Sequence, residues 1–338
     1  MDSWSECAIR HGSYGVGQSG IVLDPHELRA EAIGTERAAQ ATAGSARYRL
    51  ARGLLVQLPT SLPDDERTRL HLAIDIAAEA ATGLKAHRAT RGSSERTLEF
   101  KGRRELVTAA DKASEQGLVD RIRDAFPDDA IEAEEGVATP AGRADRAALW
   151  CWTIDPLDGT TNFVHGHPSY SVSIGILRAG EPHLGVVHAP ELGGVAGGEC
   201  FYGAVGVGAW KNGQPIRVSA TETLRDAVVG TGFSYIRNEP GVNTNLDNFG
   251  RVLMEVRGIR RCGSAALDVV YVAAGVYDAF WEMYLEPYDV AAGIAILRGA
   301  GGVATDLGSG AGSLRGQEIL ATNGRLTEEL AALLTGRP

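Results

Sequence analysis

The chain has 338 residues, of which 44% are hydrophobic and 22% charged, so it is long enough to bury one large core or two closely packed ones. Its net charge of −10 argues against sequence-independent binding of nucleic acid, which depends on basic surface. The sequence has no run of about eighteen apolar residues, no basic-then-apolar N-terminal signal pattern and no C-x-x-C pair. We therefore expect a cytoplasmic protein with reduced cysteines, without a membrane span or a zinc site.

The first sixty residues differ from the rest. They open with a glycine- and serine-rich piece, residues 11–20, and continue as an alanine-rich, charged stretch with little periodicity. We predict that residues 1–60 form a flexible extension with a helix near 46–58. Both a loosely ordered appendage and a regulatory or partner-binding arm are compatible with this composition.

Apolar residues then recur at helical spacing. The pattern predicts a helix over residues 64–92, and Leu118 and Ile122 belong to the inward face of a second helix, from about Asp111 to just before Pro127. Short strand-like runs with glycine and proline between them predict antiparallel sheet in this half, at 150–154, 170–177, 184–188 and 198–202.

The second half alternates between strands and helices. Strands are predicted at 227–232, 278–281 and 318–322. Helices are predicted at 245–256, 264–274, 290–299 and 326–334.

One short segment, W-T-I-D-P-L-D-G-T-T-N-F, carries the most chemistry. The bulky residues 152–154 suit a buried strand, and Pro156 is expected to end its ladder pairing just after Asp155. Gly159 allows a sharp turn, and backbone N–H groups from there to Thr161 would be free at a helix N-terminus, which favours anions.

The carboxylates in this segment indicate a cation. Asp155 and Asp158 beside an anion site would repel phosphate unless positive charge lay between them. Magnesium takes hard oxygen ligands and bridges carboxylates to phosphate. The segment therefore predicts a magnesium-assisted phosphate site, and the alternative is a strand followed by a solvated Asp-Gly turn.

The same segment resembles a signature of the inositol monophosphatase-like, magnesium-dependent and lithium-sensitive phosphatases, which runs aromatic, hydrophobic, D-P-hydrophobic-D-G-T-x-N-F. A second family signature, aromatic-D-x-A-A-G ending in G-G, is similar to residues 288–302, with Tyr288 where members often carry Trp. Glu134 and Glu135 resemble the acidic pair that precedes the first signature. The resemblance extends from about Ser61 to the C-terminus.

This resemblance implies an α/β (α+β) fold, a layered α-β-α-β-α sandwich. It implies a catalytic domain over residues 61–338, with a metal- and phosphate-binding half at 61–220 and a substrate-binding half at 221–338. It also implies a homodimer and inhibition by lithium.

The resemblance further implies which groups bind magnesium. Glu134, Asp155 and the main-chain carbonyl of Leu157 would bind one ion, and Asp155, Asp158 and Asp289 a second. Asp155 would bridge the two. Glu134 could also contact a weaker third ion.

The attacking water is expected to be held by the hydroxyl of Thr160, itself oriented by Asp111, which matches the Asp of the family's L-V-T-x-x-D segment. Taken alone, Asp111 is better explained as a helix N-cap, where Asp is favoured. Backbone groups of Gly159, Thr160 and Thr161 would hold the phosphate oxygens. No covalent intermediate is needed for such hydrolysis.

On the alcohol side, the resemblance places Gly263, Ser264, Ala265 and Glu282, with Asp158 able to reach a substrate hydroxyl. In isolation Ser264 is better explained as a helix N-cap and Glu282 as a surface carboxylate at a strand end.

The resulting prediction is a magnesium-dependent phosphomonoesterase acting on a small phosphorylated polyol, with inositol 1-phosphate as the family's default substrate. An amino alcohol phosphate such as histidinol phosphate fits the same residues. Fructose 1,6-bisphosphatase and nucleotide 3′-phosphatase activities are further alternatives. From another class comes a partner-binding protein in which catalysis is secondary or lost.

Overall fold

The computed structural model describes residues 40–42, 45–49, 55–90, 99–100, 106–107, 109–136, 148–194, 197–307 and 317–336. Residues from Ala39 onward belong to one compact unit. Of the extension predicted over residues 1–60, residues 1–39 lie outside the described part. In that part, no helix combines the length and apolar character needed to cross a membrane.

The helix predicted near residues 46–58 is wrong, because this stretch forms sheet. Strands β1 (Gln40–Thr42), β2 (Ser45–Arg49) and β3 (Leu55–Pro59) pair antiparallel in that order. Polar and apolar residues alternate along S-A-R-Y-R with the two-residue period of a strand. That short alternation is a better guide here than the helix propensity of the Ala, Arg and Leu residues.

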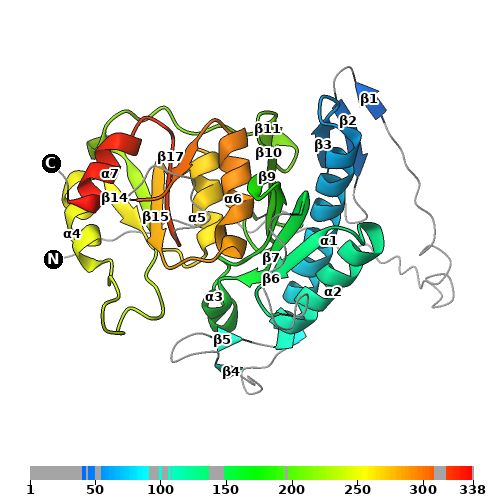
Figure 1. The fold of residues 1–338 in the computed structure, drawn as a ribbon, viewed down its shortest axis with the longest axis horizontal. Coiled ribbons are helices and arrows are strands. Elements are labelled where there is room, and N and C mark those ends of the chain that lie inside the picture. Colours follow the sequence, from blue (N-terminus) through cyan, green and yellow to red (C-terminus); the bar gives the residue numbers. More distant parts are fainter. Residues whose placement is uncertain are drawn as a thin grey trace, which may run out of the picture. The chain divides into compact units, whose positions relative to one another are not determined.

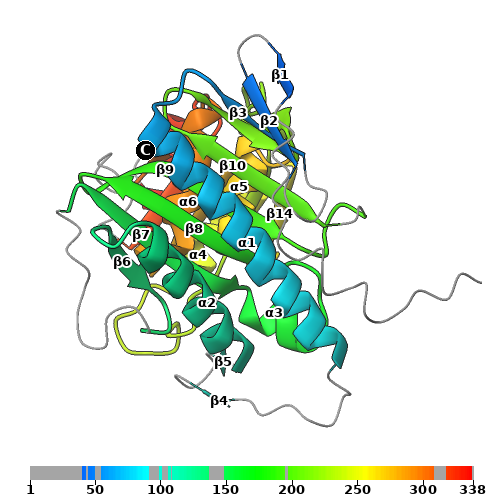
Figure 2. The ribbon, with the colours of Figure 1, turned by 90° about the vertical axis from the view of Figure 1, so that its right-hand side faces the viewer.

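Two long helices follow the predicted pattern closely. Helix α1 spans Asp64–Thr90 and α2 spans Ala109–Ala125, with the short strands β4 (Glu99–Phe100) and β5 (Leu106–Val107) paired between them. Figure 2 shows both helices lying across one face of a large sheet. Leu70, Ile74 and Leu118 are fully buried beneath them, as their spacing predicts.

This first sheet has the strand order β12-β11-β10-β9-β8-β7-β6. Its pairs are antiparallel except β6 with β7, which confirms the predicted antiparallel character of this half. The strands are β6 (Ala130–Ala133), β7 (Trp150–Asp158), β8 (Ser171–Arg178), β9 (Glu181–Ala189), β10 (Glu199–Ala204), β11 (Gly208–Lys211) and β12 (Gln214–Pro215). The short helix α3 (Thr160–His165) directly follows β7.

The second sheet has the order β14-β13-β15-β17-β16 and mixes parallel with antiparallel pairs. Its strands are β13 (Val228–Thr231), β14 (Gly258–Arg260), β15 (Ala279–Met283), β16 (Val303–Thr305) and β17 (Glu318–Thr322). The 3-10 helix η2 (Leu224–Asp226) precedes it, and its helices are α4 (Leu246–Glu255), α5 (Ala265–Ala273), α6 (Pro287–Gly299) and α7 (Thr327–Thr335).

The layers confirm the α-β-α-β-α arrangement. Figure 1 shows α1 and α2, the first sheet, α5 and α6, the second sheet, and α4 with α7 in succession. Helix α6 packs very closely on the first sheet, because a Cβ added to Gly185 in β9 would lie 2.2 Å from the carbonyl oxygen of Ala292. A Cβ added to Gly293 would lie 2.7 Å from Val269 of α5. The small residues of the A-A-G motif therefore place α6, and with it Asp289, between its neighbours.

Candidate active site

The end of β7 contains an irregularity that the sequence did not predict. Pairing with β8 was expected to end at Asp155, but β7 runs on to Asp158, which pairs with Ser171 after a register shift. The unpaired residues include Pro156, which has no N–H to donate. The N–H of Leu157 bonds instead to Oδ1 of Asp155, at 2.9 Å. The bulge thus fixes Asp155 while the Leu157 side chain packs in the core.

Gly159 makes the turn into α3, as predicted. Its φ of 91° lies in the left-handed region that favours glycine. A Cβ at this position would also lie 3.0 Å from the carbonyl oxygen of Ser169 and 3.2 Å from that of Gly263. Only glycine therefore fits both the backbone conformation and the close packing at this position of the predicted phosphate-binding turn.

Asp111 and Thr160 meet as predicted, although they are far apart in sequence. The Thr160 hydroxyl lies 3.2 Å from Oδ1 of Asp111 and 3.1 Å from the carbonyl oxygen of Leu157, and it can donate to either. Asp111 is 1% exposed and sits in the first turn of α2, which begins at Ala109. It is therefore not the N-cap, and the alternative explanation for Asp111 is wrong.

Asp158 links β7 to the beginning of α5. Its carboxylate accepts hydrogen bonds from the Ser264 hydroxyl and from the backbone N–H groups of Ala265 (3.2 Å) and Ala266 (2.9 Å). Burial raises the pKa of Asp158 to about 6, and the bond from Ser264 opposes that rise. Ser264 is also the N-cap of α5 and accepts from the Leu267 N–H. The N-cap explanation of Ser264 is therefore confirmed, while its contact with substrate stays a prediction.

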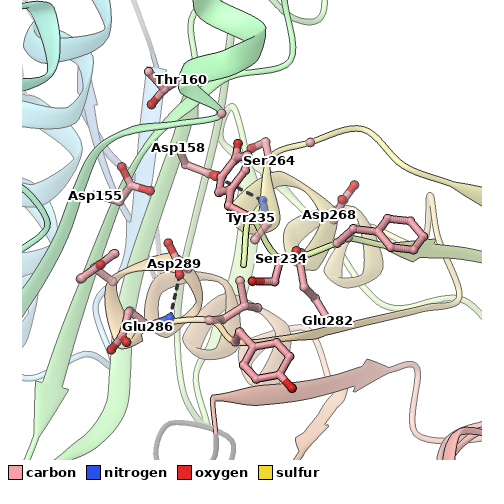
Figure 3. Close-up of a pocket in the computed structure, with 18 of the residues that line it drawn as sticks. Asp155, Asp158, Thr160, Ser234, Tyr235, Ser264, Asp268, Glu282, Glu286 and Asp289 are labelled. Carbon is pink, nitrogen blue, oxygen red and sulfur yellow. Dashed lines mark hydrogen bonds between the residues drawn. The ribbon is translucent and has the colours of Figure 1, made fainter. Parts of the chain in front are cut away.

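Burial and neighbouring carboxylates raise the pKa values of Asp155 and Asp289. Burial raises the pKa of Asp155 well above its usual value, and the charges of Glu134, Asp158 and Asp289 add to the rise. Asp289 responds in the same way, first to burial and then to Glu134. Its Oδ2 also accepts the N–H of Glu286, at 2.7 Å, in the capping box of α6 (Figure 3).

This donor set fits divalent cations chemically. Among the described residues, no three His, Cys, Asp or Glu side chains are arranged closely enough to hold a metal ion directly. Several desolvated carboxylates that repel one another are, however, costly unless they bind protons or cations. Hard oxygen donors of this kind are those that magnesium prefers.

A cavity of about 390 Å³ brings the predicted residues together. Those that line it are Glu134, Asp155, Leu157, Asp158, Gly159, Thr160, Gly263, Ser264, Ala265, Glu282 and Asp289. Asp111 does not line the cavity but accepts a hydrogen bond from Thr160, which does. Thr161 does not line the cavity, but its hydroxyl lies 3.2 Å from that of Tyr235, which does.

Glu282 faces this cavity, so its alternative explanation as a surface carboxylate at a strand end is wrong. It belongs to β15, and its carboxyl group lies against Gly232, where an added Cβ would be 2.0 Å away. Burial raises the pKa of Glu282 to about 7, while Arg261 acts to lower it.

Sequence reasoning missed several residues that line the cavity, among them Tyr235, Arg261, Asp268 and Glu286. A signal existed for Asp268, because it lies four residues after Ser264 in a predicted helix and so shares its face. Tyr235 and Arg261 lie outside any recognisable motif.

Comparisons with known proteins identify the family that the sequence motifs resemble. A family model described as "Inositol monophosphatase family" matches residues 65–337. The chain is 38% identical to "Inositol-1-monophosphatase" of Synechocystis over 83% of this chain and 94% of that protein. It is 36% identical to "Fructose-1,6-bisphosphatase/inositol-1-monophosphatase" of Thermotoga maritima, over 79% and 95%. The solved inositol monophosphatase of Anabaena superposes with a TM-score of 0.70 at 37% identity, covering 81% of this chain and 98% of that one.

Proposed function

Since the chain belongs to the inositol monophosphatase family of metal-dependent phosphatases, we propose that it is a magnesium-dependent phosphomonoesterase whose main substrate is inositol 1-phosphate. One observation carries the proposal. The acidic residues at the end of β7 share a cavity with Asp289 and with Thr160, which is bonded to Asp111.

We propose that the metal ligands are those of the sequence prediction. Glu134, Asp155 and the Leu157 carbonyl would hold one ion, and Asp155, Asp158 and Asp289 a second, with a third and weaker ion at Glu134. When bound, such ions neutralise the phosphate charge and lower the pKa of an attacking water. The raised pKa values of Asp155 and Asp289 support this assignment, because nearby cations would favour the ionised carboxylates.

Thr160 would orient the attacking water. When its hydroxyl donates to Asp111, its oxygen lone pairs are left to accept a hydrogen from water. A water held in this way directs its own lone pair at phosphorus, which suits in-line attack. We propose that backbone N–H groups of Gly159, Thr160 and Thr161 hold the phosphate oxygens.

Glu282 would accept hydrogen bonds from the leaving alcohol, with Gly263, Ser264 and Ala265 alongside. Histidinol phosphate remains an alternative substrate, because its ammonium group could pair with the same carboxylate. The division near residue 220 also remains a proposal, since ligands from both halves meet in one cavity. From the family resemblance we propose a cytoplasmic, lithium-sensitive homodimer.

The direct test is phosphate release from inositol 1-phosphate and histidinol phosphate, with magnesium and with a chelator. We expect turnover that needs magnesium and prefers inositol 1-phosphate. Equal turnover in the presence of chelator would contradict the metal assignment. No release from either compound would contradict the phosphatase proposal.

A second candidate substrate class, a sugar bisphosphate, is favoured by a neighbouring cavity. This cavity of about 410 Å³ shares Phe233 and Arg261 with the first and is also lined by Arg237. Two guanidinium groups beside the alcohol side could bind a second phosphate. The Thermotoga maritima relative is named for both activities.

Arg237→Gln separates the two candidates. If a bisphosphate is the better substrate, the variant should lose about tenfold or more in kcat/KM for fructose 1,6-bisphosphate and much less for inositol 1-phosphate. If Arg237→Gln leaves kcat/KM for each substrate at its wild-type value, the second candidate is excluded.

A further inference from the structure

Asp268 is a carboxylate in the cavity to which the proposed chemistry assigns no role. It belongs to α5, one helical turn after the N-cap Ser264, and it lines the cavity. Its side chain is buried, with 1% of the residue exposed. Its Oδ1 atom is also buried and has no hydrogen-bond partner among the residues that the structure describes.

An unsatisfied acceptor in such a place is unusual. Leaving a buried polar group unpaired is costly, and native proteins seldom do so without a reason. The neighbouring charges do not remove that cost. Burial raises the pKa of Asp268 well above its usual value, and the charges of Glu282 and Asp158 add to the rise. Arg261 acts to lower it but forms no ion pair with Asp268 in the described part of the chain.

The position of Asp268 indicates what would pair with it. Figure 3 shows Asp268 and Glu282 on one side of the cavity, away from Asp155 and Asp289, with Asp158 and Ser264 between the two groups. A phosphate held beside Asp155 would extend its alcohol past Ser264, toward Asp268.

We propose that Oδ1 of Asp268 accepts a hydrogen bond from the leaving alcohol of the substrate, and so selects phosphate esters whose alcohol carries a hydrogen-bond donor. This inference rests on the proposed phosphatase function and deepens it. The donor is a polyol hydroxyl or an ammonium group. An alcohol without a donor leaves Oδ1 unpaired, so it binds less tightly.

The test compares three substrates with magnesium present. Inositol 1-phosphate offers hydroxyls, histidinol phosphate offers an ammonium group, and 4-nitrophenyl phosphate offers no donor on its leaving group. Asp268→Ala should lower kcat/KM by about tenfold or more, mainly through KM, for whichever of inositol 1-phosphate and histidinol phosphate supplies the donor. The loss for 4-nitrophenyl phosphate should be much smaller. Asp268→Asn, which keeps an acceptor oxygen, should recover much of the lost activity.

The substrate with the largest loss in kcat/KM identifies the donor as hydroxyl or ammonium. Val272→Ala is the matched control, because it truncates a buried residue one turn further along α5 that does not line the cavity. It should leave the ratio between substrates as in wild type.

The outcomes separate this inference from the function on which it rests. If wild type hydrolyses both kinds of ester and Asp268→Ala slows them all equally, Asp268 is structural and the inference is overturned. Unchanged kinetics in Asp268→Ala would overturn it as well. A wild type that releases phosphate from none of the three would instead overturn the proposed function, and this inference with it.

Discussion

The two ends of the cavity are built in different ways. At the end proposed to bind phosphate, called the phosphate end, consecutive residues 155–160 supply most of the proposed functional groups from one bulged strand end, and Asp111 is hydrogen-bonded to Thr160. At the alcohol end, Tyr235, Asp268 and Glu282 come from a loop, a helix and a strand that are well separated in sequence. The groups proposed for the reaction chemistry are thus close together in sequence, while those proposed for substrate choice meet only through the tertiary structure.

The two ends of the cavity also differ in how far their carboxylate acceptors are paired by hydrogen bonds within the protein. At the phosphate end, Asp158 accepts hydrogen bonds from Ser264, Ala265 and Ala266 within the protein itself. At the alcohol end, Asp268 leaves an acceptor unpaired among the described residues. A preformed phosphate end should act on many esters, whereas the alcohol end should discriminate among them.

The largest effect is expected from Asp155→Asn. We expect a fall of at least about a hundredfold in kcat with both inositol 1-phosphate and 4-nitrophenyl phosphate, because loss of even an indirect metal contact costs ten- to hundredfold. The measurement is steady-state phosphate release with saturating magnesium.

Stability gives that variant a second readout. In chelator, Asp155→Asn should melt at a higher temperature than wild type, because it removes a buried carboxylate repelled by its neighbours. The control is Asp129→Asn, which weakens the ion pair with Arg69 (2.8 Å) and should lower the melting temperature without changing the turnover of folded enzyme. A lower melting temperature for both variants would contradict the account of the acidic cluster.

The next effect concerns the pair behind the phosphate end. Thr160→Ala and Asp111→Ala should each lower kcat by about ten- to hundredfold with little change in KM. The reason is that the two wild-type side chains are proposed to orient the attacking water and not the substrate. Because the two residues act as one unit, the double variant should be about as slow as the slower single variant. Losses that multiply would show that the residues act independently.

A smaller and more selective effect is expected at the alcohol end. Glu282→Gln should lower kcat/KM for inositol 1-phosphate by about tenfold, with a smaller loss for 4-nitrophenyl phosphate, because it replaces a charged acceptor. Equal losses for the two esters would mean that the ends are not separable.

The smallest effect is on pH dependence. Burial raises the pKa of Glu282 to about 7, so its carboxylate forms as the pH rises through that value. The preference for inositol 1-phosphate over 4-nitrophenyl phosphate should therefore increase severalfold between about pH 6 and pH 8. Glu282→Gln should abolish the increase, and a variant that keeps it would exclude Glu282 as its source.

The same pKa shift affects stability with a defined sign. The folded protein holds the Glu282 proton more tightly than the unfolded chain, so this group stabilises the fold at low pH. That contribution is lost as the pH rises from the unfolded pKa toward 7. Urea unfolding of wild type and Glu282→Gln at both ends of this range measures it.

Much of the fold could be predicted because its elements are long and strongly periodic. The helix expected at residues 64–92 is α1, and the strand expected at 318–322 is β17. The prediction of a helix near 46–58 was wrong because it followed the helix propensity of single residues. The short alternating pattern in this stretch is stable only as paired strands. The sequence predicted that pairing of β7 ends at Asp155, because the bulge around Pro156 that lets the strand continue is not visible in composition.

By itself, the sequence determined the longer helices and strands and the family, and it proposed the groups at the phosphate end, because these depend largely on neighbours within a few residues. It also predicted that Asp111 and Thr160 act together, through resemblance to the family. Only the tertiary structure decided that Asp268 and Arg261 share a cavity with Glu282, since no local pattern links a helix, a loop and a strand. Burial in that cavity raises the pKa values of Asp268 and Glu282, because desolvation and charge repulsion depend on which distant carboxylates become neighbours.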